Sequence, residues 1–399
     1  MVREQVTLVP VGSVLEKIHR QPKVKKSDYE HKGMLPIIDQ GADFIGGYTD
    51  DESIAYQGKL PVVIFGDHTR ILKFVTSPFA VGADGTQLLR PCEGWDIRYF
   101  YYCLLELKLK NYGYERHFKY LKEERIPQRP LQSQQKISSF LSAYDALIEN
   151  NTRRIQILEQ MAQMIYREWF VNFRFPGHEK VKLVESPLGK IPQGWEVSQI
   201  GRVVETLGGG TPNTKNPAYW EDGTINWFTP SDLTSAKALF LGESSRKITE
   251  LGLDESSANL FPANSVMMTS RATIGAIAIN TAPATTNQGF ITCVPSSPLS
   301  VYHIVAWERQ NMEIIISIAS GATFKEISRG EFRELPICVP PEHVEQHYFG
   351  TVDPMYQKIR VLLAKNANLR RTRDLLLPKL ISGELDVSEL DIATAEKMG

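Results

Sequence analysis

The side chains of this 399-residue chain that could do chemistry are few, and those that suggest an enzyme do so incompletely. Asn216-Pro217-Ala218-Tyr219 and Asp353-Pro354-Met355-Tyr356 match part of the Asn/Asp-Pro-Pro-Tyr/Phe loop of amino-methyltransferases, but both lack its second proline. A cofactor-binding glycine loop should follow a strand and open a helix in a separate domain, whereas Gly208-Gly209-Gly210 runs directly into Thr211-Pro212. We therefore expect no methyl transfer by this chain, and we assign Asn216 and Asp353 to turns or a helix start.

Nuclease and metal chemistry are supported no better. Asp84 with Glu106-Leu107-Lys108 loosely fits the Asp and Glu-x-Lys pair of metal-dependent nucleases, but Glu106 and Lys108 fall on a helical pattern and lack a counterpart later in the chain. The eight histidines do not cluster, and the four cysteines show no metal-ligand spacing. We expect no catalytic residues, no metal, and cysteines that stay reduced in the cytosol.

Composition describes an ordinary soluble protein with two or three domains. The net charge of −1 excludes a protein that binds DNA through bulk positive charge, although local basic patches occur. These patches are Lys23/Lys25/Lys26, Arg116 to Lys122, Arg153/Arg154 and Arg370/Arg371/Arg373. No apolar run approaches the ~18–20 residues that span a bilayer, and residues 1–10 lack a signal-peptide pattern, so we expect a cytoplasmic protein.

The chain contains an internal repeat with a period of roughly 200–210 residues, which indicates duplicated domains rather than a solenoid. Hairpin-like strands, a polar turn, a helix and a closing apolar run with prolines follow one another in the same order twice. The paired segments are Leu60–Phe65 with Ser265–Thr269, Ile71–Val75 with Ile274–Ile279, Gly82–Gly85 with Thr286–Gly289, Asp96–Leu109 with Leu299–Ile318, and Ile126–Pro130 with Leu335–Pro341.

A long helical pattern follows each closing run, with seam residues spaced alternately by four and three positions. Sustained heptads of this kind predict a coiled coil. The central seam positions are Ile148, Asn151, Ile155 and Leu158 in the first helix, and Ile359, Leu362, Asn366 and Leu369 in the second. If the helices pack antiparallel, the repeat places Asn151 opposite Asn366, and we expect these two amides to meet. Pro354 and Pro378 should start, kink or end the second helix.

The predicted fold class is α+β, with two mixed α/β globular domains that are each followed by a long helix. The expected boundaries are 1–131 for the first globular domain, 132–174 for the first helix, 175–194 for a loop-rich connector, 195–340 for the second globular domain, 341–386 for the second helix, and 387–399 for a tail.

Several segments resemble the DNA-specificity subunits of Type I restriction-modification enzymes, in the order of that family. Leu188 to Val197, and Gly209-Gly210-Thr211-Pro212 with Ile225-Asn226-Trp227 and Ser231-Asp232-Leu233, are similar to the opening of a target-recognition domain. Arg167 to Phe173 and Leu375 to Leu385 resemble the ends of the two conserved helices. The first half departs from the pattern because it lacks the Gly-Gly-Thr-Pro opening.

The resemblance implies that each half reads one part of a bipartite, asymmetric DNA target, and that the antiparallel helices space the halves and dock partners. Those partners are two methylation subunits, which bind S-adenosylmethionine, and two ATP- and magnesium-dependent restriction subunits; the chain itself would hold no cofactor and catalyse nothing. The alternative is a stand-alone DNA-binding or scaffold protein, which would not recruit a methyltransferase subunit.

Candidate DNA contacts come from the repeated polar turns, because arginine pairs with guanine and asparagine or glutamine with adenine in the major groove. They are His68, Thr69, Arg70, Arg116, His117 and Lys119 in the first half, and Ser270, Arg271, Thr273, Asn287, Gln288, Thr323 and Lys325 in the second. The alternative for each residue is a turn cap or a surface salt bridge.

Overall fold

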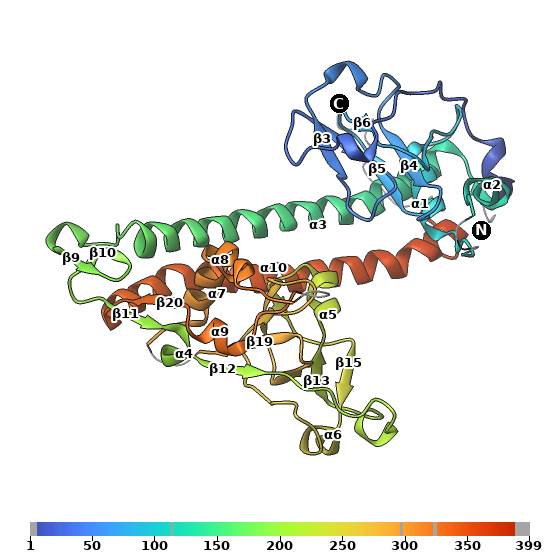
Figure 1. Cartoon of the computed structure of the whole chain (residues 1–399). Coiled ribbons are helices and arrows are strands. Elements are labelled where there is room, and N and C mark those ends of the chain that lie inside the picture. The colour runs from blue at the N-terminus through green and yellow to red at the C-terminus, as the bar shows by residue number, and fades with distance from the viewer. Residues whose placement is uncertain (1–5, 112, 114, 296–297, 322–324, 388–399) are drawn as a thin grey trace. The chain divides into compact units, whose positions relative to one another are not determined.

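The computed structural model describes residues 6–111, 113, 115–295, 298–321 and 325–387, which form two compact units (Figure 1). Unit 1 contains the described residues up to Glu149 and those from Ala367 onward, and unit 2 is Asn150–Asn366. Both boundaries therefore fall inside the long helices. The sequence-based boundaries made each helix a separate segment, whereas in the structure each half-helix belongs to the core of the unit in which it lies.

Unit 1 is built from one strand pair and two three-stranded sheets, with the orders β5-β4-β7 and β3-β2-β6. The pair joins the start of the globular part to its end, because β1 (Thr7–Pro10) is antiparallel to β8 (Arg125–Gln128). The other strands are β2 (Leu35–Ile38), β3 (Gly47–Thr49), β4 (Val62–Gly66), β5 (Leu72–Val75), β6 (Ala80–Val81) and β7 (Thr86–Leu89). The short helices are α1 (Ile97–Glu106), whose N-cap Asp96 accepts from the Tyr99 amide, and α2 (Phe118–Glu123).

Unit 2 has the same plan with additions. Its first and last globular strands also pair, β11 (Glu196–Gln199) with β20 (Pro336–Val339), and its sheets have the orders β12-β19-β16-β17-β14 and β15-β13-β18. The remaining strands are β12 (Glu205–Gly208), β13 (Ile225–Phe228), β14 (Phe240–Leu241), β15 (Arg246–Ile248), β16 (Val266–Thr269), β17 (Ile277–Asn280), β18 (Ala284–Thr286) and β19 (Phe290–Val294). The short helices are α4 (Ile200–Val203), α5 (Pro230–Ala236), α6 (Glu250–Asp254), α7 (Val301–Gln310), α8 (Met312–Ser317) and α9 (Arg329–Arg333).

The duplication that the sequence predicts is present in the strand pairing. β4 is antiparallel to both β5 and β7, as β16 is to β17 and β19; β2 pairs antiparallel with β3 and parallel with β6, as β13 does with β15 and β18. Individual hydrogen bonds between loops also occur at equivalent places in the two units. The Asp67 amide donates to the Gly85 carbonyl at 2.7 Å, and the Ser270 amide donates to the Gly289 carbonyl at 2.8 Å.

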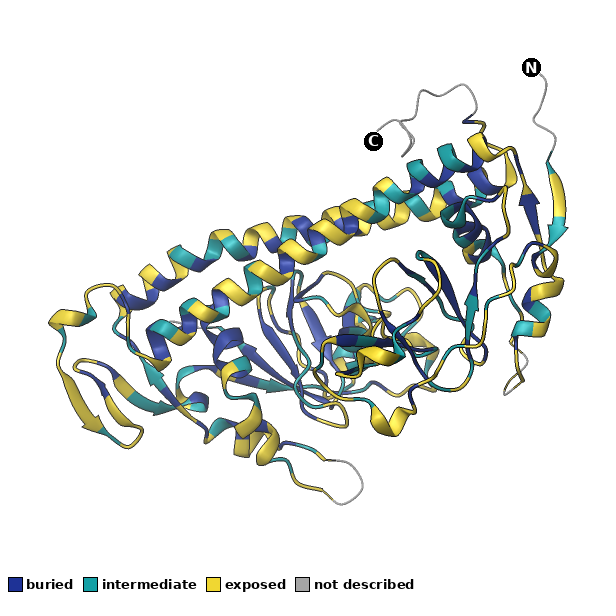
Figure 2. Ribbon diagram, turned by 90° about the horizontal axis from the view of Figure 1, so that it is seen from above, coloured by how far each residue is buried: buried dark blue, intermediate teal, exposed yellow. Residues whose placement is uncertain are grey.

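The two long helices are α3 (Leu131–Tyr166), which continues into a π-helical turn at Arg167–Val171, and α10 (Glu342–Ser382). The second helix neither starts nor ends at Pro354 or Pro378, because α10 runs through both positions, and the assignment of Asp353 to a turn or helix start is wrong for the same reason. Buried positions on both sides of each proline hold the helix in place (Figure 2).

Within each unit, residues of the two half-helices share a hydrophobic core. In unit 1, Leu141 of α3 shares a core with Leu380 of α10. In unit 2, Ile155 shares a core with Ile359, and Leu362 lies in the same cluster. The other predicted seam residues are also removed from solvent. Ile148, Asn151 and Asn366 are buried, and Leu158 and Leu369 are half-buried.

Two contacts in unit 2 give the direction of the half-helices. The Asn151 Nδ2 donates to Asn366 Oδ1 at 2.9 Å, which is the contact expected from the repeat, and the Trp169 ring lies 5.2 Å from that of His347. Because the later residue of the first helix contacts the earlier residue of α10, these half-helices are antiparallel.

The connector is more ordered than the sequence suggests. It contains a hairpin of β9 (Leu183–Ser186) and β10 (Gly189–Pro192), and Gly189 occupies the positive-φ position that such a tight turn favours. Phe175 packs against Trp195 with ring centroids 5.4 Å apart, so both ends of the connector are fixed in the core of unit 2. Among the described residues, no helix is long and apolar enough to cross a membrane.

Candidate nucleic-acid interface

A cationic cleft of about 780 Å³ opens in unit 1 between the segment before β2 and the loop before β7. Arg20, Lys23, Lys25 and Arg116 line it, and all four are exposed. The Lys23 Nζ donates to the Thr86 carbonyl at 2.9 Å, which fixes one ammonium in the wall. Desolvation lowers the pKa of Lys23, and the nearby Asp84 carboxylate opposes that effect. A cleft with this charge suits phosphate oxygens.

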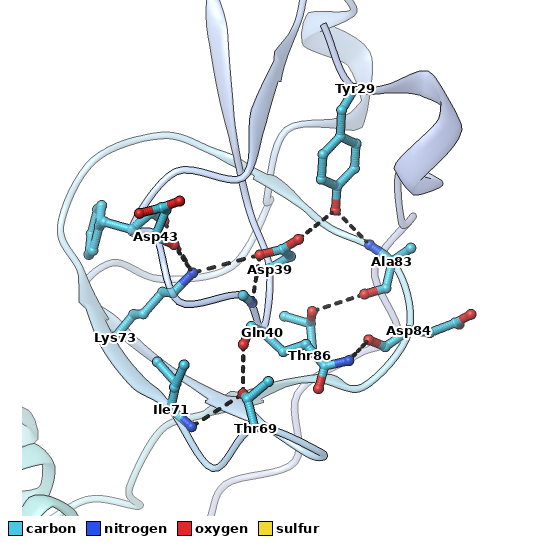
Figure 3. A network of polar contacts seen from close by, with 12 residues as sticks. Tyr29, Asp39, Gln40, Asp43, Thr69, Ile71, Lys73, Ala83, Asp84 and Thr86 are labelled. Carbon is cyan, nitrogen blue, oxygen red and sulfur yellow. Dashed lines mark hydrogen bonds and ion pairs between the residues drawn. The ribbon is translucent and has the colours of Figure 1, made fainter. Parts of the chain in front are cut away.

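Gln40 ties three loops together beside this cleft (Figure 3). Its Oε1 accepts from the His68 amide at 3.0 Å, its carbonyl accepts from the Thr69 hydroxyl at 2.6 Å, and its Nε2 donates to the Asp84 carbonyl at 2.8 Å. The loops after β2, β4 and β6 therefore form one braced surface. Sequence reasoning missed Gln40, because a single glutamine in a loop carries no pattern.

The structure separates the first-half candidates into exposed side chains and turn residues. His68, Arg116 and Lys119 are exposed, although Lys119 pairs with Glu115 at 3.1 Å. Thr69 is also exposed, but its hydroxyl is used twice within the turn, since it also accepts from the Ile71 amide at 3.3 Å.

Two first-half candidates make contacts inside unit 1, and the burial of one of them, His117, corrects its assignment as a DNA contact. Arg70 is half-buried with a φ of 61°, and its Nη1 donates to the Leu109 carbonyl at 3.0 Å. His117 is fully buried, and its Nδ1 lies 3.0 Å from the Asp67 carbonyl oxygen. The His117 ring is therefore not exposed at the surface of unit 1.

The second-half candidates divide in the same way. Ser270 is 2% exposed and holds the turn through its peptide groups, so its assignment as a contact is corrected. Asn287 is half-buried, and its Oδ1 accepts from the Gly289 amide at 3.0 Å. The exposed members are Arg271, Thr273, Gln288 and Lys325, and Thr323 lies outside the described residues. Arg271 Nε lies 3.5 Å from Glu326 Oε2, an exposed ion pair that a ligand anion can replace.

The repeated hydrogen bonds show which exposed residues occupy equivalent positions. The Asp67 carbonyl also accepts a hydrogen bond from the His117 amide at 2.8 Å. In unit 2 the Ser270 carbonyl accepts one from the Ile327 amide at 2.9 Å. The residues that directly follow Asp67 and Ser270 are His68 and Arg271. His68 is therefore the structural counterpart of Arg271.

The Gly-Gly-Thr-Pro segment forms a second polar surface in unit 2. A Cβ at Gly209 would lie 2.0 Å from the Asn287 carbonyl oxygen, and one at Gly210 would lie 2.3 Å from the Ser257 carbonyl carbon, so only glycine fits at either position. The Thr211 hydroxyl, placed by this turn, donates to Gln288 Oε1 at 2.5 Å. Sequence reasoning used this segment as a family signature and missed Thr211 as a contact candidate.

The enzyme-like motifs have ordinary structural roles. Asn216 Oδ1 accepts from the Ala218 amide at 3.2 Å and caps the 3-10 turn Pro217–Tyr219, as expected from the sequence. Asp353 Oδ1 accepts from the Tyr302 hydroxyl at 3.0 Å on the side of α10. In the part of the chain that the structure describes, no group of histidine, cysteine, aspartate or glutamate side chains is arranged to hold a metal ion.

Comparison with known proteins agrees with this picture of a two-part reader. The family described as Type I restriction modification DNA specificity domain matches residues 4–160 and 192–371. The chain is 37% identical over 187 residues to the Type I restriction enzyme MjaIX specificity subunit of Methanocaldococcus jannaschii, which covers 46% of this chain and only 42% of that protein. It is 26% identical over 372 residues to the EcoR124I/EcoR124II specificity subunit of Escherichia coli, covering 88% and 86%.

A solved structure has the same fold. The crystal structure of a Type I restriction-modification system S subunit from M. genitalium aligns with a TM-score of 0.58 at 18% identity, over 96% of this chain and 97% of that chain.

Proposed function

Since this chain belongs to the Type I restriction modification DNA specificity family, we propose that its two units each read one part of a bipartite, asymmetric DNA sequence. The observation that carries the proposal is the pair of equivalent turns. The same hydrogen-bonded turn occurs once in each unit, and it carries His68 in unit 1 and Arg271 in unit 2 at equivalent positions. Different side chains on equivalent turns read different bases, which makes the target asymmetric.

The roles within unit 1 follow from charge. Arg20, Lys23, Lys25 and Arg116 bind phosphates and set the position of the duplex, and they carry no sequence information. His68, on the turn that Gln40 braces, contacts base edges. In unit 2, Arg271 and Gln288 take the base-reading role, since a guanidinium pairs with guanine and a carboxamide pairs with adenine through two hydrogen bonds each.

The helices space the two readers as an antiparallel coiled coil and dock partner subunits. The seam contacts within each unit support the coiled coil, and an apolar stripe on α3 supports docking: Ile157, Met161 and Met164 recur at helical spacing and are 45%, 44% and 66% exposed. Two methylation subunits, which bind S-adenosylmethionine, and two restriction subunits, which use ATP and magnesium, complete a cytoplasmic enzyme. The chain itself binds no cofactor and contributes recognition without catalysis.

The decisive experiment is to map adenine methylation across the genome of cells with and without this gene. We expect one bipartite, asymmetric motif to lose methylation when the gene is deleted. Unchanged methylation at every motif would refute the proposal.

Two biochemical experiments support the genetic one. The purified chain should transfer no methyl group from labelled S-adenosylmethionine and should not cleave DNA with ATP and magnesium; turnover that follows this chain through purification would contradict the assigned role. A tagged chain should co-purify with a methyltransferase subunit. A stand-alone DNA-binding protein would bind DNA alone and recruit none.

A further inference from the structure

A buried lysine in unit 1 is hydrogen-bonded to the surface loop between β2 and β3. Lys73 on β5 is 4% exposed, and its Nζ donates to the carbonyls of Asp43 at 2.5 Å and Phe44 at 3.3 Å (Figure 3). The same Nζ lies 3.7 Å from Asp39 Oδ1. Burial lowers the pKa of Lys73, and the Asp39 carboxylate opposes that effect. An ammonium is costly to bury unless it is paired and hydrogen-bonded, so these contacts must be kept.

The other end of the network is equally tied. The Asp39 carboxylate accepts from the Gly41 amide at 2.8 Å and from the Tyr29 hydroxyl at 3.2 Å. The main chain from Asp39 to Phe44 is therefore held at both ends by bonds to charged groups, which are stronger than neutral ones. These bonds restrain the loop.

The loop presents two apolar side chains to solvent. Phe44 is 51% exposed and the adjacent Ile45 is 37% exposed. Single exposed apolar residues are common on protein surfaces. Here, however, a neighbouring pair lies at the tip of a loop whose carbonyls are anchored by a buried ammonium.

The position of this loop indicates what it contacts. Gln40, next to Asp39, bonds to the turn that carries His68 and to Asp84, which lines the cationic cleft. The loop that carries Phe44 is thus joined through Gln40 to the turn of His68 and to the wall of the cleft. An apolar tip on a surface that also carries this cationic cleft fits DNA better than an apolar protein surface, because DNA supplies phosphates for cations that outnumber the carboxylates of Asp67 and Asp84 in the cleft.

We propose that Phe44, backed by Ile45, is a wedge that enters the base stack in the half of the target read by unit 1. Apolar side chains of this kind unstack a base step and bend the duplex, while neighbouring cations hold the backbone on both sides. A side chain that unstacks bases needs a loop that does not shift when the side chain enters the base stack. The Lys73 contacts restrain the loop that carries Phe44. The inference rests on the proposed function and adds a deformation of the DNA to it.

The test begins with the full chain and a library of random duplexes, from which it enriches its own target. The adenines of one enriched duplex are then replaced in turn by 2-aminopurine, whose fluorescence rises when it is unstacked. We expect a rise at one step in the unit 1 half with the native chain and none with Phe44→Ala, together with roughly 5- to 150-fold weaker binding. Phe44→Trp should keep the signal. Met34→Ala is the matched control, because Met34 is 72% exposed at the other end of β2 and should change neither readout.

The outcomes separate the two proposals. Failure to enrich any sequence would overturn the proposed function and the wedge together. Enrichment with a 2-aminopurine signal that Phe44→Ala leaves intact would overturn the wedge alone. If Phe44→Ala keeps DNA affinity but loses a co-purified methyltransferase subunit, the loop is a protein interface and the wedge is wrong.

Discussion

Replacing the amide pair between α3 and α10 tests the register of the helices directly. Asn366 is 1% exposed and Asn151 is 9% exposed, and besides their mutual bond the Asn366 Nδ2 donates to Thr152 Oγ1 at 3.2 Å. Asn366→Leu removes both bonds and leaves the Asn151 amide facing a leucine. Changing both residues to leucine removes the pair without leaving either amide alone in the seam.

The expected magnitudes follow from these contacts. A net hydrogen bond contributes about 1 kcal/mol, and a buried amide left without a partner costs about 1–3 kcal/mol. Each leucine also gains apolar burial next to Ile155 and Leu362, but this gain appears in both arms of a double-mutant cycle and cancels. We expect a coupling free energy of about 1–3 kcal/mol. In a unit of the length of Asn150–Asn366, that corresponds to about 2–12 °C in the melting temperature.

The assay is thermal unfolding of the full chain for the native protein, both single variants and the double variant. Each single variant should melt below the double variant, and the double variant should melt at or above the native protein, because an apolar seam is usually at least as stable as a polar pair. Asn150→Leu and Asn368→Leu, which change exposed asparagines one or two positions away, should have little effect. Single and double effects that simply add would refute the coupling. The double variant should also tolerate a wider range of gap lengths in its DNA target, since the amides no longer fix the register.

Three further predictions follow from the two units. Arg271→Ala should weaken recognition of one half of the target by about 1–3 kcal/mol, measured against duplexes altered in either half, whereas Arg70→Ala should act through the fold of its turn. Arg116→Ala should weaken binding to specific and random duplexes alike and reduce the slope of log affinity against log salt by about 1; an unchanged slope would remove it from the phosphate contacts. Burial raises the pKa of Glu308 from 4.5 to about 8, so the folded state keeps a proton that the unfolded chain releases. Stability should therefore fall between about pH 4.5 and 8 by up to about 1.4 kcal/mol per pH unit, and denaturant titrations should show that Glu308→Gln removes this slope.

The strands β4, β5, β16 and β17, the helical segments that contain α1 and α7, and the two long helices could be predicted from the sequence, because each depends on a local apolar period. The seam contact of Asn151 with Asn366 could be predicted for the same reason, since both the heptads and the repeat fix its register. The continuity of α10 could not. Pro354 is a helix breaker by local rules, yet α10 continues through it, and Val352 and Tyr356 on either side of it are buried in the core of unit 2.

The candidate site was harder to predict, because exposure depends on bonds between distant segments. His117 looks like a surface residue in a polar turn, but it lies beneath the turn at Asp67, fifty positions earlier in the sequence. The same holds for Gln40, whose partners His68 and Asp84 lie on two later loops. Residue types in a turn show what chemistry is available, and only the fold shows which of them face outward.

The equivalent turns explain how one frame can carry two different specificities. Around Asp67 and Ser270 the fold is held by peptide groups, so the bonds do not depend on the side chain at the next position. His68 and Arg271 can therefore differ without disturbing the core beneath them. The wedge loop of unit 1 follows the opposite rule, since Asp39 and Lys73 hold it through buried side chains that must be kept as a pair. The proposed base-reading residues thus stand where substitution should cost little, and the proposed wedge stands on a loop where substitution of Asp39 or Lys73 should cost most.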